Sequence, residues 1–176
     1  MVVVSGSTNL SQEEDRPSAS PFLPKPARKV GPEGLKPGEP VPLTVLLLED
    51  NETDEFVIRE VLEQSGHVFR VDVARDGHDA VEYLRRVEDD EEMPCPALIL
   101  LDLNVPKISG SEVLRQVRRS SRCSRTPVIV VSSSDSESDR AAAQSLGVQA
   151  YFRKPANLKA YLDLIDVIKQ VLGGIR

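Results

Sequence analysis

Cysteine is scarce in this sequence, which contains only Cys95 and Cys123. Two cysteines form at most one pair, and these two lack the spacing of a zinc site, which argues against metal binding through sulfur. We expect both to be reduced thiols in a cytoplasmic protein, because structural disulfides are rare in that compartment.

Long apolar runs and a basic excess are also missing. No stretch approaches the roughly 20 residues that span a bilayer, and the opening Met1–Val4 lacks the basic flank and the length of a signal peptide. The 22 Lys and Arg residues against 28 Asp and Glu give a net charge of -6 and no basic stripe. We therefore expect a soluble protein that binds neither membranes nor nucleic acids.

Proline is distributed unevenly along the 176 residues. Residues 1–42 hold eight of the 13 prolines and four of the ten glycines, and this composition opposes helix formation while offering little apolar surface to offset ordering entropy. We expect a disordered Pro-rich tail over residues 1–42 and one folded domain over residues 43–176. Pro-x-x-Pro patterns occur at Pro21–Pro24 and Pro37–Pro40, but they arise readily by chance here, so we favour a plain linker over a docking ligand.

From Leu43 onward, strand-like and helix-like patterns alternate five times. Predicted strands cover residues 43–48, 69–73, 97–101, 128–131 and 150–152. The second alternates apolar and polar residues and is expected at a sheet edge, whereas the third is continuously apolar and is expected to be buried on both faces. Predicted helices follow each strand, with starts near residues 54, 77, 111, 136 and 158. This (βα)5 alternation predicts a doubly wound parallel sheet covered by helices on both faces, with right-handed crossovers.

Charged side chains near two of these helices suggest solvent contact. Arg115, Arg118 and Arg119 are expected to face water, the last two near the negative end of the helix dipole. The acidic run Glu88–Glu92 is expected to be a solvated loop.

The last helix has apolar residues on two faces. One set is expected to face the core: Leu158, Leu162, Ile165 and Leu172. A second set at helical spacing suggests broader packing or a dimer interface: Ala160, Leu164, Val167 and Val171.

Polar residues follow the predicted strands at four places. Glu49 and Asp50 follow the first strand, Asp102 the third, Ser132 the fourth and Lys154 the fifth. In a doubly wound sheet the carboxyl ends of the strands share one rim, so these side chains are expected to converge. Each taken alone is an ordinary cap or surface charge, but their joint placement favours a site.

Converging carboxylates need a neutralising partner. Mg²⁺ supplies one, because it favours carboxylate and carbonyl oxygens and often bridges to a phosphate oxygen. Lys154 adds a positive charge and Ser132 a hydroxyl donor, both suited to a phosphoryl group.

Residues 43–172 resemble the receiver domain of two-component response regulators. The resemblance rests on VLLLEDN at the first strand, LILLDLNVPKISG at the third, PVIVVSSS at the fourth and AYFRKP at the fifth. It implies a flavodoxin-like three-layer fold with strand order 2-1-3-4-5. The segments DGHDAVEYLRR, LNVPKISG and KPANL further resemble the small regulators that partner bacterial phytochromes.

The resemblance also implies a role for each rim residue. Asp102 would be the phosphoryl acceptor, forming 4-aspartylphosphate, and Lys154 would pair with the phosphate. Ser132 would be the family's hydroxyl and Tyr151 its aromatic switch. The implied Mg²⁺ ligands are the carboxylates of Glu49, Asp50 and Asp102 and the backbone carbonyl of Asn104.

Function and partners follow from these roles as expectations. A sensor histidine kinase, with a bacterial phytochrome as one candidate, would donate the phosphoryl group, and the protein would catalyse only its own phosphorylation and dephosphorylation. The signal would pass through a surface made by the fourth helix, fifth strand and fifth helix, which would also form a homodimer and bind an unknown downstream protein. No output domain follows residue 172, so we expect a single-domain regulator.

Three other functions remain open. An aspartyl-nucleophile phosphatase generally has a second acid two residues after the first, where this chain has Asn104. A flavin site would want a phosphate-cradling loop after the first strand, where Glu49, Asp50 and Asn51 would repel phosphate. The third is a receiver-like interaction module that has lost phosphorylation, and the intact residue set argues against it.

Overall fold

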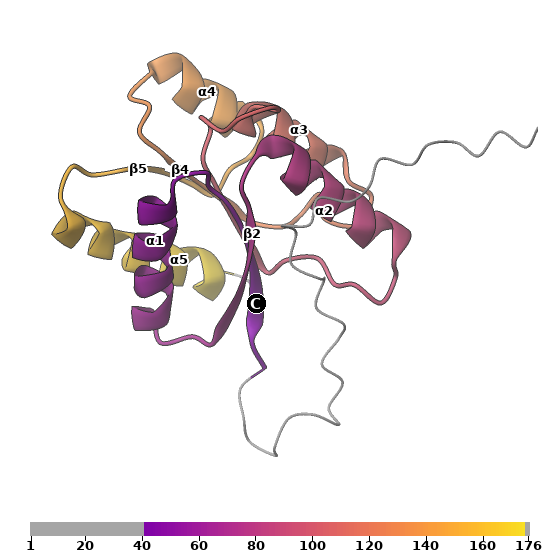
Figure 1. Cartoon of the computed structure of the whole chain (residues 1–176), viewed down its shortest axis with the longest axis horizontal. Coiled ribbons are helices and arrows are strands. Elements are labelled where there is room, and N and C mark those ends of the chain that lie inside the picture. Colours follow the sequence, from indigo (N-terminus) through magenta and orange to yellow (C-terminus); the bar gives the residue numbers. More distant parts are fainter. Residues whose placement is uncertain (1–40, 175–176) are drawn as a thin grey trace, which may run out of the picture.

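A computed structural model describes residues 41–174, and the N-terminal segment expected to be disordered lies outside the described residues. Five parallel strands form one sheet in the order β2-β1-β3-β4-β5, which confirms the predicted fold (Figure 1). The strands are β1 (Leu43–Leu48), β2 (Phe69–Ala74), β3 (Leu98–Leu101), β4 (Val128–Ser132) and β5 (Ala150–Arg153). As predicted, β2 lies at one edge, and β3 is buried along its whole length between β1 and β4.

Helices cover both faces of this sheet. The helical elements are α1 (Glu52–Gln64), α2 (Gly77–Asp89), α3 (Gly110–Arg119), α4 (Glu137–Ser145), the 3₁₀ turn η2 (Leu158–Leu162) and α5 (Asp163–Gly173). Helices α1 and α5 pack on one face with Val45 and Leu47, whereas α2, α3 and α4 pack on the other with Leu46 and Leu48 (Figure 1). Successive β1 side chains thus alternate between two apolar layers, as the pleat of a strand requires.

Side-chain caps fix where four of the helices begin. Asn51, Asp76, Ser109 and Ser136 each accept a hydrogen bond from a backbone N–H in the first turn of α1, α2, α3 and α4. Such caps satisfy donors that have no partner within the helix. Each capping residue lies in the loop that follows a strand, so the N-termini of these four helices lie at the carboxyl end of the sheet.

The predicted core stripe of the last helix is wrong at two of its four positions, because Ile165 and Leu172 pack against the core as expected but Leu158 and Leu162 do not. Leu158 and Leu162 are exposed, at 67% and 41% of their surface, while Tyr161, Leu164 and Ile168 are buried. Residues Leu158–Leu162 wind as a 3₁₀ turn with three residues per turn before α5 begins, so a 3.6-residue pattern drawn from Leu158 loses phase. Leu164, from the second apolar set, is fully buried in the core, as broader packing of this helix would have it.

The prediction of two reduced thiols is also wrong, because Cys95 and Cys123 form a disulfide. Cys95 precedes β3 and Cys123 precedes β4, and these neighbouring parallel strands begin at the same end of the sheet. Their Cα atoms lie 5.5 Å apart, within the range that a disulfide spans. The prediction rested on the rarity of disulfides in the cytoplasm, and that general tendency says nothing about whether these two cysteines lie close together.

Two expectations about charged side chains also need correction. Arg118 does not face water but is half-buried, and its guanidinium donates to the carbonyl oxygens of Ser124, Thr126, Leu146 and Gly147. Glu88 belongs to α2 rather than to a loop, and it accepts hydrogen bonds from the hydroxyls of Ser120 and Ser121. Both side chains join segments distant in sequence, which a pattern confined to one helix cannot reveal.

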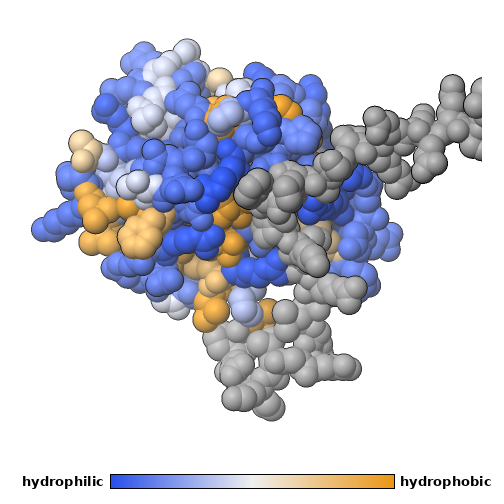
Figure 2. Space-filling model, in the orientation of Figure 1, coloured by the Kyte–Doolittle hydropathy of each residue, from blue (hydrophilic) through white to orange (hydrophobic). Residues whose placement is uncertain are grey.

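The surface of the described residues is mostly polar. Within residues 41–174 no helix has the length and apolar character needed to cross a membrane. On the visible face the largest apolar area lies on the side of the molecule where Figure 1 places α1 and α5, and smaller apolar areas appear elsewhere (Figure 2).

Candidate functional site

The rim at the carboxyl ends of the strands holds a cluster of four charged side chains. Lys154, just after β5, donates from Nζ to Glu49 Oε2 at 2.7 Å, Asp102 Oδ2 at 2.7 Å and Asp54 Oδ2 at 2.8 Å. Glu49 follows β1 and Asp102 follows β3, so three strand ends bring these groups together. The predicted convergence of the rim residues is present in the fold.

Burial sets the electrostatics of this cluster. The side chains of Glu49, Asp102 and Lys154 are only 1%, 5% and 8% exposed. Burial raises the pKa of Glu49 to about 7, with Lys154 opposing the shift and Asp102 adding to it. Burial alone would lower the pKa of Lys154, but hydrogen bonds to Asp102, Asp54 and Glu49 outweigh it and raise that pKa. Lys154 therefore stays charged, and its single positive charge is shared by three carboxylates.

The carboxylates at this rim also form a possible cation site. Glu49, Asp50 and Asp102 each offer an oxygen, and the three atoms lie within 4.8 Å of one another. Asp50 is exposed, so the group opens to solvent on one side. With Asp54 included, the rim holds four acidic side chains against one lysine, and this excess of negative oxygen donors fits a hard divalent cation such as Mg²⁺. The donor set lacks the nitrogen and sulfur ligands that favour zinc.

The backbone holds Asp102 in place. Its N–H donates to the carbonyl of Leu48 in the neighbouring strand at 3.0 Å, and Asn104 N–H donates to Asp102 Oδ1 at 3.0 Å. The start of α3 packs tightly behind it, because a Cβ on Gly110 would lie 2.1 Å from the Asp102 carbonyl oxygen. Only glycine fits at this position. Since Asp102 Oδ1 accepts from Asn104, Oδ2 is the oxygen that contacts Lys154.

Ser132 lies at the end of β4, on the same rim but beside the cluster. Its side chain is completely buried, and its hydroxyl is 3.5 Å from the Asn104 amide nitrogen. Its carbonyl accepts the Lys154 N–H at 2.9 Å, which ties the strand that carries Ser132 to the residue that carries the charge. The described hydrogen bonds include none between the Ser132 hydroxyl and the rim carboxylates.

Tyr151, the predicted switch, contacts the β4–α4 loop instead of the carboxylates. Its hydroxyl donates to the carbonyl of Ser134 at 3.2 Å, and the Arg140 guanidinium lies 4.8 Å from its ring centroid. The half-buried ring therefore joins β5 to α4.

The sequence reasoning missed two residues of this site. Asp54, in the first turn of α1, accepts from Lys154, and Tyr161 of η2 donates its hydroxyl to Asp54 Oδ1 at 3.1 Å. Burial, followed by the charge of Asp54, raises the pKa of Tyr161 to about 12. Asp54 was read only as the start of a helix, although an acid one turn beyond Glu49 and Asp50 faces the same rim. No sequence signal pointed to Tyr161.

Comparison with known protein families adds an independent line of argument. Residues 45–166 match the model of the response regulator receiver domain. The chain is 38% identical over 132 residues to response regulator Rcp1 of Synechocystis sp., an alignment that covers 75% of this chain and 86% of that protein.

Two solved structures are similar in both fold and sequence. One is the phosphorylated cyanobacterial phytochrome response regulator RcpA, with a TM-score of 0.69 and 34% identity, covering 77% of this chain and 97% of that one. The other is the Mn²⁺-bound form of response regulator Rcp1, with a TM-score of 0.66 and 36% identity, covering 73% of this chain and 93% of that one.

Proposed function

The chain belongs to the response regulator receiver domain family, and on that premise we propose that Asp102 accepts a phosphoryl group from a phosphohistidine of a sensor histidine kinase. The observation that carries the proposal is the 2.7 Å contact between Lys154 Nζ and Asp102 Oδ2 inside a buried carboxylate cluster. Receiver domains are signalling proteins rather than enzymes acting on a separate substrate, so the chain would catalyse only its own phosphorylation and dephosphorylation.

The chemistry assigned to Asp102 is nucleophilic displacement. A carboxylate oxygen of Asp102 attacks the phosphorus, the phosphorus–nitrogen bond to the donor imidazole breaks, and its electron pair stays on that nitrogen. Lys154, held in place by Glu49 and Asp54, lies where it would pair with the negative oxygens of the phosphoryl group. Positioning and electrostatics would supply most of the rate enhancement in such a transfer.

A Mg²⁺ ion fits the remaining donors of this rim. The carboxylates of Glu49, Asp50 and Asp102 would hold it, together with the backbone carbonyl of Asn104, and the Mn²⁺-bound relative supports a divalent cation at this site. When bound, the ion would supply positive charge to the phosphoryl oxygens. Oxygen donors of this kind suit Mg²⁺, Ca²⁺ and Mn²⁺ rather than the metals that prefer nitrogen or sulfur ligands.

The output is proposed to be a changed protein-binding surface. An added phosphoryl charge would draw the Ser132 hydroxyl toward it and shift Tyr151 away from Ser134, rearranging the loop before α4. We assign dimerisation and binding of a downstream protein to the surface formed by α4, β5 and α5. Sedimentation that shows monomers only, with and without a phosphoryl analogue, would contradict the dimer.

The proposed kinase is of the bacterial phytochrome type. The names of the similar proteins Rcp1 and RcpA support this assignment. A cytoplasmic location stays a proposal, and the disulfide removes the free-thiol argument for it. Phosphotransfer from a panel of sensor kinases, with phytochrome kinases included, would identify the donor.

Labelling by acetyl phosphate tests the acceptor directly. With Mg²⁺ present, the full chain should gain one phosphoryl group by intact mass, and Asp102→Asn should gain none. Asp135→Asn is the matched control, because Asp135 is an exposed carboxylate on a neighbouring loop, and its ion pair in the described part of the chain is with Arg153. Undiminished labelling of Asp102→Asn would place the acceptor elsewhere, and no labelling of the unaltered chain would favour an interaction module without phosphorylation.

A further inference from the structure

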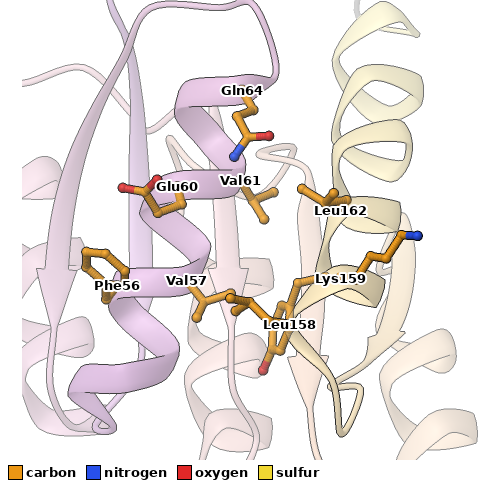
Figure 3. A pocket seen from close by; sticks show the side chains of 9 residues that line it. Phe56, Val57, Glu60, Val61, Gln64, Leu158, Lys159 and Leu162 are labelled. Carbon is orange, nitrogen blue, oxygen red and sulfur yellow. The ribbon is translucent and has the colours of Figure 1, made fainter.

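A groove of about 510 Å³ lies between α1 and η2, beside the phosphoryl site, with which it shares only Tyr161 among the described residues. Val57 and Val61 of α1 point across it toward Leu158 and Leu162 (Figure 3), and the buried Tyr161 also lines it. Its volume is in the range of clefts that hold ligand side chains. The groove is therefore large enough to accept apolar side chains from a peptide segment.

Exposed apolar side chains concentrate at this groove. Within residues 41–174, five large apolar side chains are exposed, and three of them line it: Phe56 at 62%, Leu158 at 67% and Leu162 at 41%. Figure 2 shows an apolar area on the side of the molecule where Figure 1 places α1 and α5. A patch of this kind on an otherwise polar surface indicates a binding face rather than scattered exposure.

Helix α1, which forms one side of the groove, is acidic. Of its five acidic residues, Asp54 and Glu55 are paired with Lys154, Arg59 and Arg75, whereas Glu52, Glu60 and Glu63 are exposed and have no ion pair among the described residues. Glu60 lines the groove itself, where Lys159 is the one basic lining residue. The groove thus fits a segment in which apolar side chains are followed by positive charge.

The N-terminal segment of the same chain contains such a sequence, PFLPKPARK at Pro21–Lys29. Phe22 is the only aromatic residue before residue 41, and Leu23 follows it directly. Lys25, Arg28 and Lys29 come next, with no acidic residue among them. The other apolar stretch, Val2–Val4, is followed first by acidic charge at Glu13 and lacks this complementarity.

The length of the intervening chain permits intramolecular contact. Leu23 lies 18 positions before Val41, and an extended chain of that length spans up to about 60 Å. A folded domain of this size has a radius of gyration of about 14 Å, so every face lies within reach. Three prolines in the segment limit its unbound conformations, which lowers the entropy lost on binding.

We propose that Pro21–Lys29 docks in the groove between α1 and η2 of its own chain. Phe22 and Leu23 cover Phe56, Leu158 and Leu162, and the basic residues that follow lie against the acidic edge of α1. This interaction needs neither phosphate nor a cation, so it stands or falls separately from the proposed function.

Paramagnetic relaxation in the full-length chain tests the proposal. A nitroxide on Ala27→Cys attaches at one site, because Cys95 and Cys123 are joined. We expect selective broadening of amide signals from residues 52–64 and 158–162 and none from α3, which packs on the other face of the sheet. The broadening should weaken at least several-fold in Phe22→Ser/Leu23→Ser, and it should persist in the matched control Val2→Ser/Val3→Ser.

Mixing spin-labelled and isotope-labelled molecules identifies the alternative occupants. Docking within one chain is supported if broadening appears only when the spin label and the isotope label are on the same molecule, and if it does not depend on protein concentration. Broadening that appears in the mixed sample would assign the groove to the segment of a second copy and overturn the proposal. Uniform or absent broadening, or equal loss in the Val2→Ser/Val3→Ser control, would overturn it too.

Discussion

Lys154 Nζ lies 2.7 Å from Asp102 Oδ2 although 52 residues separate them in the chain. The contact exists because β3 and β5 end at the same rim of the sheet, and Asp102 and Lys154 each follow one of them closely. Two short loops therefore place the proposed acceptor and its charge partner in contact.

Replacing Lys154 should impair both phosphorylation and stability. Lys154→Met leaves Glu49, Asp54 and Asp102 without their shared cation, so phosphoryl transfer from acetyl phosphate should slow by about 10²-fold. Without Mg²⁺, loss of a buried ionic partner should lower the free energy of unfolding by about 3–5 kcal/mol. The neighbouring Arg153→Met removes an exposed charge and should match the unaltered chain in labelling rate and urea denaturation.

The hydrogen bond between Tyr161 and Asp54 should contribute measurably to stability. Because it joins η2 to α1 and its acceptor is charged, the pairwise coupling should be about 1 kcal/mol after allowance for the 27% exposure of Asp54. A double-mutant cycle of Asp54→Ala and Tyr161→Phe in urea measures it. Strict additivity of the two single changes would mean that the bond contributes nothing.

Reduction of the disulfide should destabilise the fold without touching the rim. The bond closes a loop across 28 positions, for which chain-entropy arguments give about 2–4 kcal/mol. Dithiothreitol should lower the free energy of unfolding of the unaltered chain by about 2–4 kcal/mol, measured by urea denaturation, and leave that of Cys95→Ser/Cys123→Ser unchanged. An equal effect of the reductant on both proteins would contradict this reading.

Asp76 should make stability depend on acid pH. Burial by itself would raise the pKa of Asp76, but hydrogen bonds from Lys107 and from the start of α2 lower it below the ordinary value. A lowered pKa stabilises the fold above the ordinary aspartate pKa of about 4, and this contribution is lost as the pH falls through the lowered value. Asp76→Asn retains the cap but not the charge, so its stability should fall less steeply below pH 4.

For Asp76, the cap can be separated from the ion pair by a second variant. Asp76→Ala removes both and should cost about 1 kcal/mol more than Asp76→Asn at pH 7. Parallel urea titrations from pH 2.5 to 7 measure both effects. Identical slopes for Asp76→Asn and the unaltered chain would show that the charge is not involved.

Gly110 should tolerate no side chain. A Cβ there would meet the Asp102 carbonyl oxygen at 2.1 Å, so Gly110→Ala must displace the acceptor or the start of α3. We expect a loss of at least about 2 kcal/mol in unfolding free energy and slower labelling. Gly173→Ala, at a helix end where nothing lies within 4 Å of the added Cβ, is the matched control and should be nearly neutral.

The sheet and most of the rim could be predicted because their signals are local. Each strand is a short apolar run, and Glu49, Asp102 and Lys154 each follow one directly, so topology alone brings them together. What failed depended on contacts between distant segments. Arg118 and Glu88 form hydrogen bonds with distant segments, which the apolar spacing within their own helices cannot predict. The 3₁₀ turn that starts at Leu158 changed which side of the last helix faces the core.

Asp54 and Tyr161 show why the site was incomplete in sequence. Neither follows a strand, and their contact spans 107 positions between two helical elements on the same face of the sheet. A rule that looks only at strand ends therefore finds the residues nearest the chemistry and misses those that support them from the helices.

The central strand β3 has a disulfide just before its start and the proposed phosphoryl acceptor just after its end. It enters the sheet three residues after Cys95, which is covalently bound to the next crossover, and it leaves the sheet at Asp102. Only about 13 Å of fully buried backbone lies between these points. Because the disulfide holds the start of β3 in place, a rearrangement that begins at Asp102 must spread into the loops and helices of the rim rather than along the strand.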